Sequence, residues 1–154
     1  MNVEYINPFI EASQQVFQMM TGIKPSLGKV HLKTSPYRGD SIAVIVGLTG
    51  KMRGQVIITL GNDTAKFVAS TMMGGMPVEE MDEIANSAIS ELGNMIMGNT
   101  ATILATKGIG IEITPPSLLS GEKIKISSSG MKTICVPLEL GEDNKVNIEI
   151  SLEE

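Results

Sequence analysis

The chain has 154 residues, 42% of them hydrophobic, which suits one compact domain with its own core, so we expect residues 1–154 to form a single domain. Its formal net charge is −5, and an acidic chain lacks the basic face that nucleic-acid binding requires. We therefore exclude nucleic acid as a partner, whereas a protein partner is compatible with this charge.

The first half of the chain predicts one helix and three strands. Apolar residues recur on one side of the helix, which Thr21-Gly22 and Pro25 end. The near-continuous β-branched runs of the last two strands predict a hairpin that is buried on both faces or joins another chain. The predicted elements are a helix over 4–20, a short strand over 29–33, a turn-rich loop over 35–40, and hairpin strands over 41–48 and 54–60.

Two further helices are expected in the middle of the chain. The first covers 64–73, and Asn62 or Asp63 would cap it by accepting a hydrogen bond from an unpaired backbone N–H. Gly74-Gly75 ends this helix. The longest helix follows over 79–107, and its acidic first turn suits the positive end of the helix dipole.

The remainder of the chain predicts short strands around a stiff Pro115-Pro116 loop and then a final hairpin. The strands are expected over 109–113, 123–127, 131–140 and 145–152. Residues 4–60 and 79–152 then share one order: a helix, a strand and a hairpin of two apolar strands. We predict an α+β fold in which long helices pack on a mainly antiparallel β-sheet, with two helix-strand-hairpin half repeats.

The longest helix carries two distinct faces. Apolar side chains recur at spacings of three and four on one side of the helix, and at about 100° per residue most of them fall within one broad arc, which predicts the buried face. These side chains are Ile84, Ala85, Ala88, Ile89, Leu92, Met95, Ile96, Ile103 and Leu104. Ser87, Glu91, Asn94 and Gly98, spaced four, three and four apart, form a separate face that looks outward.

Two interpretations of this outward face are open. The ordinary one is a solvated helix surface. However, Asn94 and Gly98 are poor helix formers, and a helix surface that only contacts solvent would not need residues that destabilise the helix. A glycine beside Glu91 and Asn94 leaves room for the backbone of another protein, although packing of Gly93 or Gly98 against this protein's own sheet is an equally physical reason.

Other reactive residues are few. The single cysteine, Cys135, excludes an intrachain disulfide, and its apolar setting in TICVPL predicts a buried, inert thiol. The single histidine, His31, has no partner in sequence for a metal cluster or a Ser-His-Asp triad, so we expect no metal site. No apolar run reaches transmembrane length and the N-terminus lacks signal-peptide features, so we expect a soluble, cytoplasmic protein with no membrane partner.

The run Ser87-x3-Glu91-x2-Asn94, followed by Thr114-Pro115-Pro116, resembles the signature of the CheC, CheX and FliY family of bacterial chemotaxis phosphatases. Within that family the stretch from Ser87 to Gly121 is most similar to the CheX members, and the likeness extends more loosely over the whole chain. The resemblance implies a CheC-like fold. It also implies a phosphatase that hydrolyses the aspartyl phosphate of a phosphorylated CheY-like response regulator.

The resemblance also implies roles for single residues. Asn94 would orient the attacking water, and Glu91 would dock against a lysine beside the partner's phosphorylation site, so both are the expected catalytic residues. Ser87 and Gly98 are expected to contact the partner. Mg²⁺ is expected in the bound response regulator, and no cofactor is expected in this chain. At the corresponding position of the first helix the Asn is replaced by Gln14, so we expect one active helix.

A two-fold homodimer joined through its sheet is also expected, because the resemblance to the CheX members implies a homodimer and the apolar strands 41–48 and 131–140 leave edges that must be covered. Two other classes of function compete with the phosphatase. The helix could hold a phosphorylated receiver domain or a flagellar component without speeding hydrolysis. Alternatively, the chain could be a structural assembly subunit, in which the outward face is only wet surface.

Overall fold

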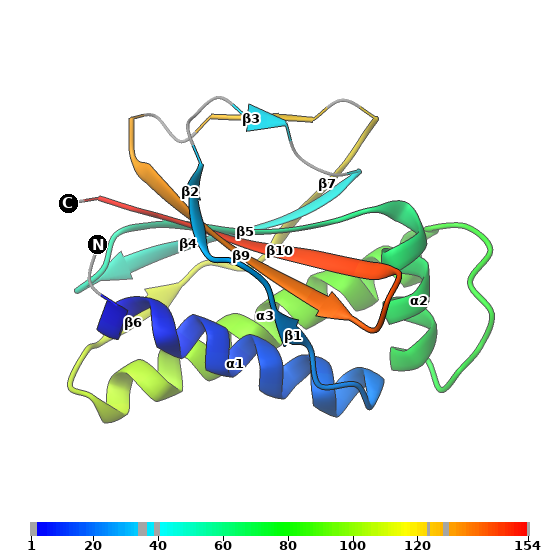
Figure 1. The fold of residues 1–154 in the computed structure, drawn as a ribbon, viewed down its shortest axis with the longest axis horizontal. Helices are drawn as coiled ribbons and strands as arrows, with labels where there is room; N and C mark the ends of the chain where they lie inside the picture. Colours follow the sequence, from blue (N-terminus) through cyan, green and yellow to red (C-terminus); the bar gives the residue numbers. More distant parts are fainter. Residues whose placement is uncertain (1–2, 34–36, 39–40, 123, 128–129, 154) are drawn as a thin grey trace.

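The computed structural model describes residues 3–33, 37–38, 41–122, 124–127 and 130–153. The elements in these parts of the chain alternate between helices and groups of strands (Figure 1). In order they are α1 (Val3–Thr21), β1 (Ser26–Leu27), β2 (His31–Lys33), β3 (Tyr37–Arg38), β4 (Ile42–Gly50), β5 (Gly54–Leu60), α2 (Asn62–Met72), α3 (Glu83–Thr106), β6 (Ile111–Ile113), β7 (Ser117–Ser120), β8 (Lys125–Ile126), β9 (Lys132–Leu140) and β10 (Asn144–Leu152).

One antiparallel sheet forms the centre of the molecule. Its strand order is β1-β9-β10-β5-β4-β6, with β2 also paired to β9 and β7 also paired to β4. The two predicted hairpins, β4–β5 and β9–β10, lie side by side through β5 and β10, where Glu149 is opposite Ile57. The predicted α+β fold with a mainly antiparallel sheet is therefore confirmed.

The two halves of the chain interlock. The short strands β1 and β2 follow α1, yet they pair with β9 of the second half. In the same way β6 and β7 follow α3, yet they pair with β4 of the first half. Each half has the predicted order of helix, strand and hairpin, with further short strands between the helix and the hairpin, and each half completes the sheet of the other.

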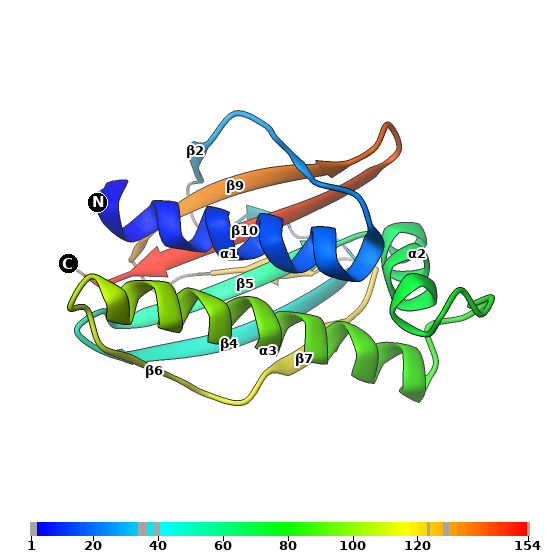
Figure 2. The same ribbon diagram turned by 90° about the horizontal axis from the view of Figure 1, so that it is seen from below.

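The helices cover one face of the sheet. Figure 2 shows α1 and α3 side by side and antiparallel across that face, with α2 near the turn between β9 and β10. Between the helices and the sheet lies the main core, to which α3 contributes Ile89, Leu92 and Ile96. On the strands, alternate residues such as Ile148 and Ile150 point into this core, whereas Glu149 between them faces the other side. The sheet thus holds α3 as a rigid rod with one side buried.

Pairing covers the strand edges that the sequence analysis left open. The outer side of β4 is paired with β6 and β7, and the outer side of β9 is paired with β1 and β2. These edges therefore need no second copy of the chain to cover them. The homodimer stays a prediction, without support from these two edges.

The boundaries of α3 differ from the predicted helix over 79–107. The helix begins at Glu83, because Asp82 is its N-cap and accepts a hydrogen bond of 2.9 Å from the backbone N–H of Ala85. Ile84, predicted on the buried face, is 67% exposed. At about 100° per residue, it points away from the middle of the buried face, so its assignment to that face was wrong.

Several predicted local features are also corrected. The helix α2 includes Asn62 and Asp63, and its N-cap is Gly61, so neither side chain caps it. The strand predicted over 123–127 shortens to β8, which pairs with β3 in a separate two-stranded sheet rather than in the main sheet. Most of the turn-rich loop predicted over 35–40 lies outside the described residues. The strand β7, after the Pro115-Pro116 loop, was not predicted, because it forms by pairing with distant β4.

Candidate functional site

The outward face of α3 carries the residues that the sequence singled out. Ser87 and Glu91 are exposed, whereas Asn94 and Gly98 are half-buried. The opposite face of the helix is anchored in the core through Leu92 and other fully buried side chains. Because that anchoring sets the rotation of the helix, the polar face is held toward solvent in a defined orientation.

A groove of about 910 Å³ runs along this face. On one side α3 supplies Glu83, Asn86, Ser87, Ser90, Glu91 and Asn94, and Met81 and Asp82 precede them. The other side is the segment from Ile113 through Pro116 to Leu118. The structure thus brings Ser87, Glu91 and Asn94 together with Thr114-Pro115-Pro116, although about twenty residues separate the two parts of the motif. Gly98 lies on the same helix but does not line the groove.

Two hydrogen bonds hold the second side of the groove in place. The backbone N–H of Gly47 donates to Thr114 Oγ1 at 2.8 Å, and the backbone N–H of Thr114 donates to the Gly47 carbonyl at 3.0 Å. Thr114 is thereby fastened to β4 just beyond its pairing with β6. The stiff Pro115-Pro116 pair that follows consequently stands opposite α3. The groove is built by the sheet as much as by the helix.

Within the described part of the chain, neither the Glu91 carboxylate nor the Asn94 carboxamide makes a hydrogen bond or an ion pair with another residue. The corresponding amide on α1 differs, because Gln14 Nε2 donates to the Pro25 carbonyl at 3.3 Å. Asn94 therefore presents both an acceptor oxygen and a donor nitrogen to whatever enters the groove. Such a group can orient a water molecule or bind a polar partner without a change of protonation.

Several residues that line the groove are not part of the sequence motif, Ser90 and Asn86 among them. Ser90 lies three residues after Ser87 and four before Asn94, a helical spacing that could have identified it. Asn86 donates through Nδ2 to the Met81 carbonyl at 3.4 Å, and its Oδ1 is buried without a partner among the described residues. Asn86, like Asn94 and Asn99, is an Asn inside a helix and so a poor helix former, but that signal did not place it at the groove, because its position there depends on how α3 is rotated against the sheet.

The two glycines of α3 have different surroundings. These surroundings show which glycine is explained by packing against the sheet and which leaves room for another protein. A Cβ atom at Gly93 would lie 2.8 Å from Val44 Cγ1, so Gly93 lets α3 approach β4 closely. A Cβ atom at Gly98 would have no atom within 4 Å outside its own helix neighbourhood. Packing against the sheet accounts for Gly93, and it does not account for Gly98.

We expect opposite effects from the same substitution at these two glycines. Gly98→Ala should raise the free energy of unfolding by about 0.5–1 kcal/mol, because alanine favours the helix and enters open space. Gly93→Ala should lower it by about 1 kcal/mol, because crowding against Val44 exceeds the gain in helix propensity. Urea denaturation of both variants and the parent protein measures this difference. Equal shifts at both positions would contradict it.

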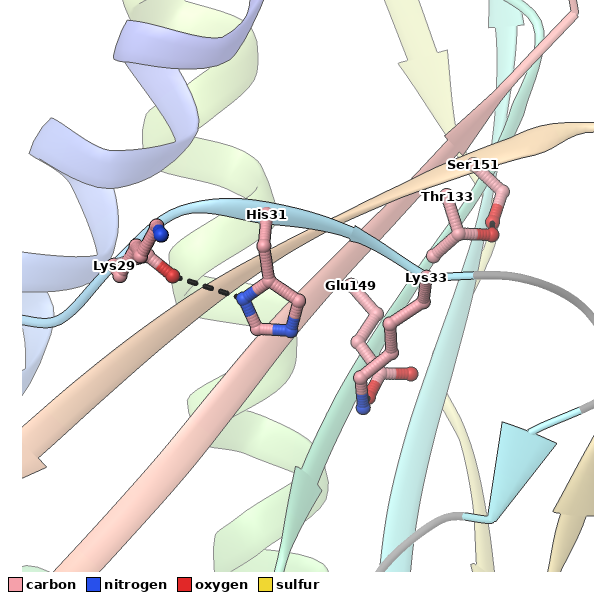
Figure 3. A network of polar contacts seen from close by, with 6 residues as sticks. All are labelled: Lys29, His31, Lys33, Thr133, Glu149 and Ser151. Carbon is pink, nitrogen blue, oxygen red and sulfur yellow. Dashed lines mark hydrogen bonds and ion pairs between the residues drawn. The ribbon is translucent and has the colours of Figure 1, made fainter.

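A second polar cluster lies on the face of the sheet that the helices leave uncovered (Figure 3). Lys33 Nζ is 2.8 Å from Glu149 Oε1, and the hydroxyls of Thr133 and Ser151 are 2.7 Å apart. Nearby on β9, burial raises the pKa of Cys135 to about 11, which keeps the thiol protonated and unreactive at neutral pH. This cluster therefore ties strands together, and Cys135 is buried as predicted.

Among the described residues, His31 is not part of a cluster of metal-ligating side chains. Its Nδ1 is 2.9 Å from the Lys29 carbonyl, in an exposed position on β2 (Figure 3). Across the described ranges, no group of three or more His, Cys, Asp or Glu side chains is placed to hold a metal ion. In the same ranges, no helix is both long enough and apolar enough to span a bilayer.

Comparisons with known proteins agree on one family. The family model described as chemotaxis phosphatase CheX matches residues 42–139. The CheY-P phosphatase CheX of Thermotoga maritima is 33% identical over 152 residues, which cover 99% of this chain and 97% of that protein. These matches include the outward face of α3 and the segment opposite it.

Solved structures agree with the same assignment. A CheC-like superfamily protein from Shewanella sp. PV-4 has a TM-score of 0.90 at 27% identity, with 100% of both chains covered. A chain of the CheX-CheY-BeF3-Mg²⁺ complex from Borrelia burgdorferi has a TM-score of 0.85 at 33% identity, covering 99% of this chain and 100% of that one. The fold and the sequence therefore resemble the same group of proteins.

Proposed function

The chain belongs to the family of the chemotaxis phosphatase CheX, and on that premise we propose that it hydrolyses the aspartyl phosphate of a CheY-type response regulator, with Asn94 orienting the attacking water. The observation that carries this proposal is the Asn94 carboxamide, which lines an open groove beside Glu91 and is not engaged by another described residue. The relative in Thermotoga maritima bears the name CheY-P phosphatase, and a relative in Borrelia burgdorferi was solved together with CheY.

The chemistry requires little more than positioning. An acyl phosphate that is bound with Mg²⁺ is already activated, so the phosphatase has to hold a water in line with the phosphorus. The Asn94 oxygen can accept a hydrogen bond from that water, and its amide nitrogen can donate one. The Mg²⁺ ion belongs to the response regulator in this proposal, since in the described part of the chain no three His, Cys, Asp or Glu side chains are placed to hold a metal ion.

The remaining residues of the outward face position the partner. Glu91 lies one helical turn from Asn94 and would pair with a lysine at the rim of the partner's phosphorylation site. Ser87 would add a supporting contact one turn further toward the start of α3. Gly98, with open space above it, would let the partner's backbone approach the helix. These three contacts would fix the register in which Asn94 enters the partner's site.

The direct test is to incubate the purified protein with a phosphorylated CheY-type regulator and to follow phosphate release over time. We expect the loss of phosphate to be faster than the regulator's own decay. An unchanged or slower decay together with tight binding would identify a non-catalytic binding module. If neither binding nor turnover occurred, and substitution of Glu91 and Asn94 changed nothing, the outward face would be ordinary surface.

Glu91→Lys should weaken complex formation by about 10-fold or more, because it places a cation where the partner is expected to present one. The dissociation constant for the phosphorylated regulator, measured by titration, checks this expectation. Glu112→Lys is a suitable control, since Glu112 is also an exposed acid but does not line the groove. An unchanged affinity in Glu91→Lys would mean that the docking role is wrong.

A further inference from the structure

Ile84 is an exposed apolar residue on the helix that carries the proposed site. It is 67% exposed, and among the large apolar side chains of α3 in the described ranges it alone is markedly exposed. Its neighbour Ala85 points into the core, together with Ile89 and Leu92. Ile84 is not among the residues of the hydrophobic clusters, so core packing does not explain an isoleucine at this position.

The position of Ile84 continues the polar face. From Ile84 the spacing to Ser87, Glu91 and Asn94 is three, four and three residues, so all four side chains leave the helix on the same side. With a rise of about 1.5 Å per residue, Ile84 is about 15 Å from Asn94 along the helix axis. A protein-sized partner that covers Asn94 and Glu91 would also cover Ile84, because a specific interface takes about 800 Å² from each partner.

The charge around this face indicates what kind of protein fits it. From Phe67 to Thr106 the chain has no Lys, Arg or His, whereas its acids include Glu79, Glu80, Glu83 and Glu91, all of them exposed. A two-fold contact with a second copy would bring this acidic face against itself, which like charges disfavour. The face therefore suits a different protein, one that presents cations around an apolar spot.

We propose that Ile84 is the apolar anchor for the response regulator and packs against an apolar side chain beside that protein's cationic rim. This inference rests on the proposed function and extends the docking surface from Asn94 to the first turn of α3. Polar contacts such as that of Glu91 orient a partner, whereas a desolvated apolar contact supplies much of the affinity. Since Ile84 is far from the reacting atoms, it should affect binding of the regulator rather than the chemical step.

The test compares Ile84→Ser with Met19→Ser, which removes another exposed apolar side chain, 61% exposed, from α1. We expect Ile84→Ser to raise KM for the phosphorylated regulator about tenfold with kcat within about twofold of the parent. Met19→Ser should leave both constants unchanged, and Ile84→Leu should retain the parent KM. An Ile84→Ser variant with the KM of Met19→Ser would overturn the anchor.

Direct titration with the same regulator separates this inference from the proposed function. If the parent protein binds but does not speed phosphate loss, the phosphatase proposal fails, and a weaker affinity in Ile84→Ser still supports the anchor. If hydrolysis is fast and Ile84→Ser binds as well as the parent, the anchor alone fails. If the parent protein does not bind the phosphorylated regulator, both proposals are overturned.

Discussion

Asn94→Ala should lower the catalysed rate of phosphate release by about 10²–10³-fold, to nearly the regulator's own rate, while the dissociation constant stays within about twofold. The substitution removes both the acceptor and the donor that would hold the water, and the alanine methyl group cannot replace either. The partner contacts proposed for Glu91 and Ser87 are untouched. Single-turnover release of phosphate measures the rate, and titration measures the affinity.

Asn99→Ala is a matched control for this prediction. Asn99 is on the same helix and is also half-buried, but it does not line the groove. Its removal should leave the rate of phosphate release unchanged. A lower rate in Asn99→Ala would instead indicate a general effect of losing an Asn from α3. If Asn94→Ala retained the parent rate, Asn94 would have no part in the mechanism, and the function of the groove would need another explanation.

Lys33→Met should lower the free energy of unfolding by about 3 kcal/mol, because it removes the cation that lies 2.8 Å from a fully buried carboxylate. Glu149 is at the middle of β10, opposite Cys135 on one side and Ile57 on the other, so water does not reach it. Methionine keeps most of the apolar stem of the lysine, so the change isolates the charge. Urea denaturation measures the loss as a lower midpoint with an unchanged slope.

Lys145→Met provides the comparison for Lys33→Met, because Lys145 lies on β10, the strand that also carries Glu149. Lys145 Nζ is 4.0 Å from Glu139 Oε1, and both side chains are exposed, so this pair should contribute less than about 1 kcal/mol. The double variant Lys33→Met/Glu149→Leu should recover part of the stability, because it also removes the buried carboxylate. If Lys33→Met were as stable as Lys145→Met, the buried ion pair would contribute little to the fold.

Part of the candidate site could be predicted from the sequence because helices are governed by local spacing. The relation of Ser87, Glu91 and Asn94 on one side of a helix depends only on a period of about 3.6 residues. The prediction for Ile84 was wrong because it followed the apolar residue type. The angular position of Ile84 on the helix is opposite the buried face, and the side chain is exposed. A polar or apolar character is thus a weaker guide than the angular position.

The opposite side of the groove illustrates what local patterns do not contain. Thr114 is held there by Gly47, and β7 exists because Ser120 pairs opposite Ile42, partners that are far away in the chain. Short segments such as Ser117–Ser120 have too little local preference to form a strand alone, so their structure depends on a partner strand. The resemblance to a known family connected Pro116 with Asn94, but the contact surface between them appeared only in the folded chain.

The sequence by itself therefore determined the helices, the two hairpins and the grouping of Ser87, Glu91 and Asn94, since periodicity and turn residues act over a few neighbouring positions. Only the tertiary structure decided that the short strands of each half complete the sheet of the other. It also decided that Gly93 serves internal packing while Gly98 has open space, and that a groove separates α3 from Thr114-Pro115-Pro116. These features depend on contacts between segments that are distant in the chain, and such contacts form only when the whole core is assembled.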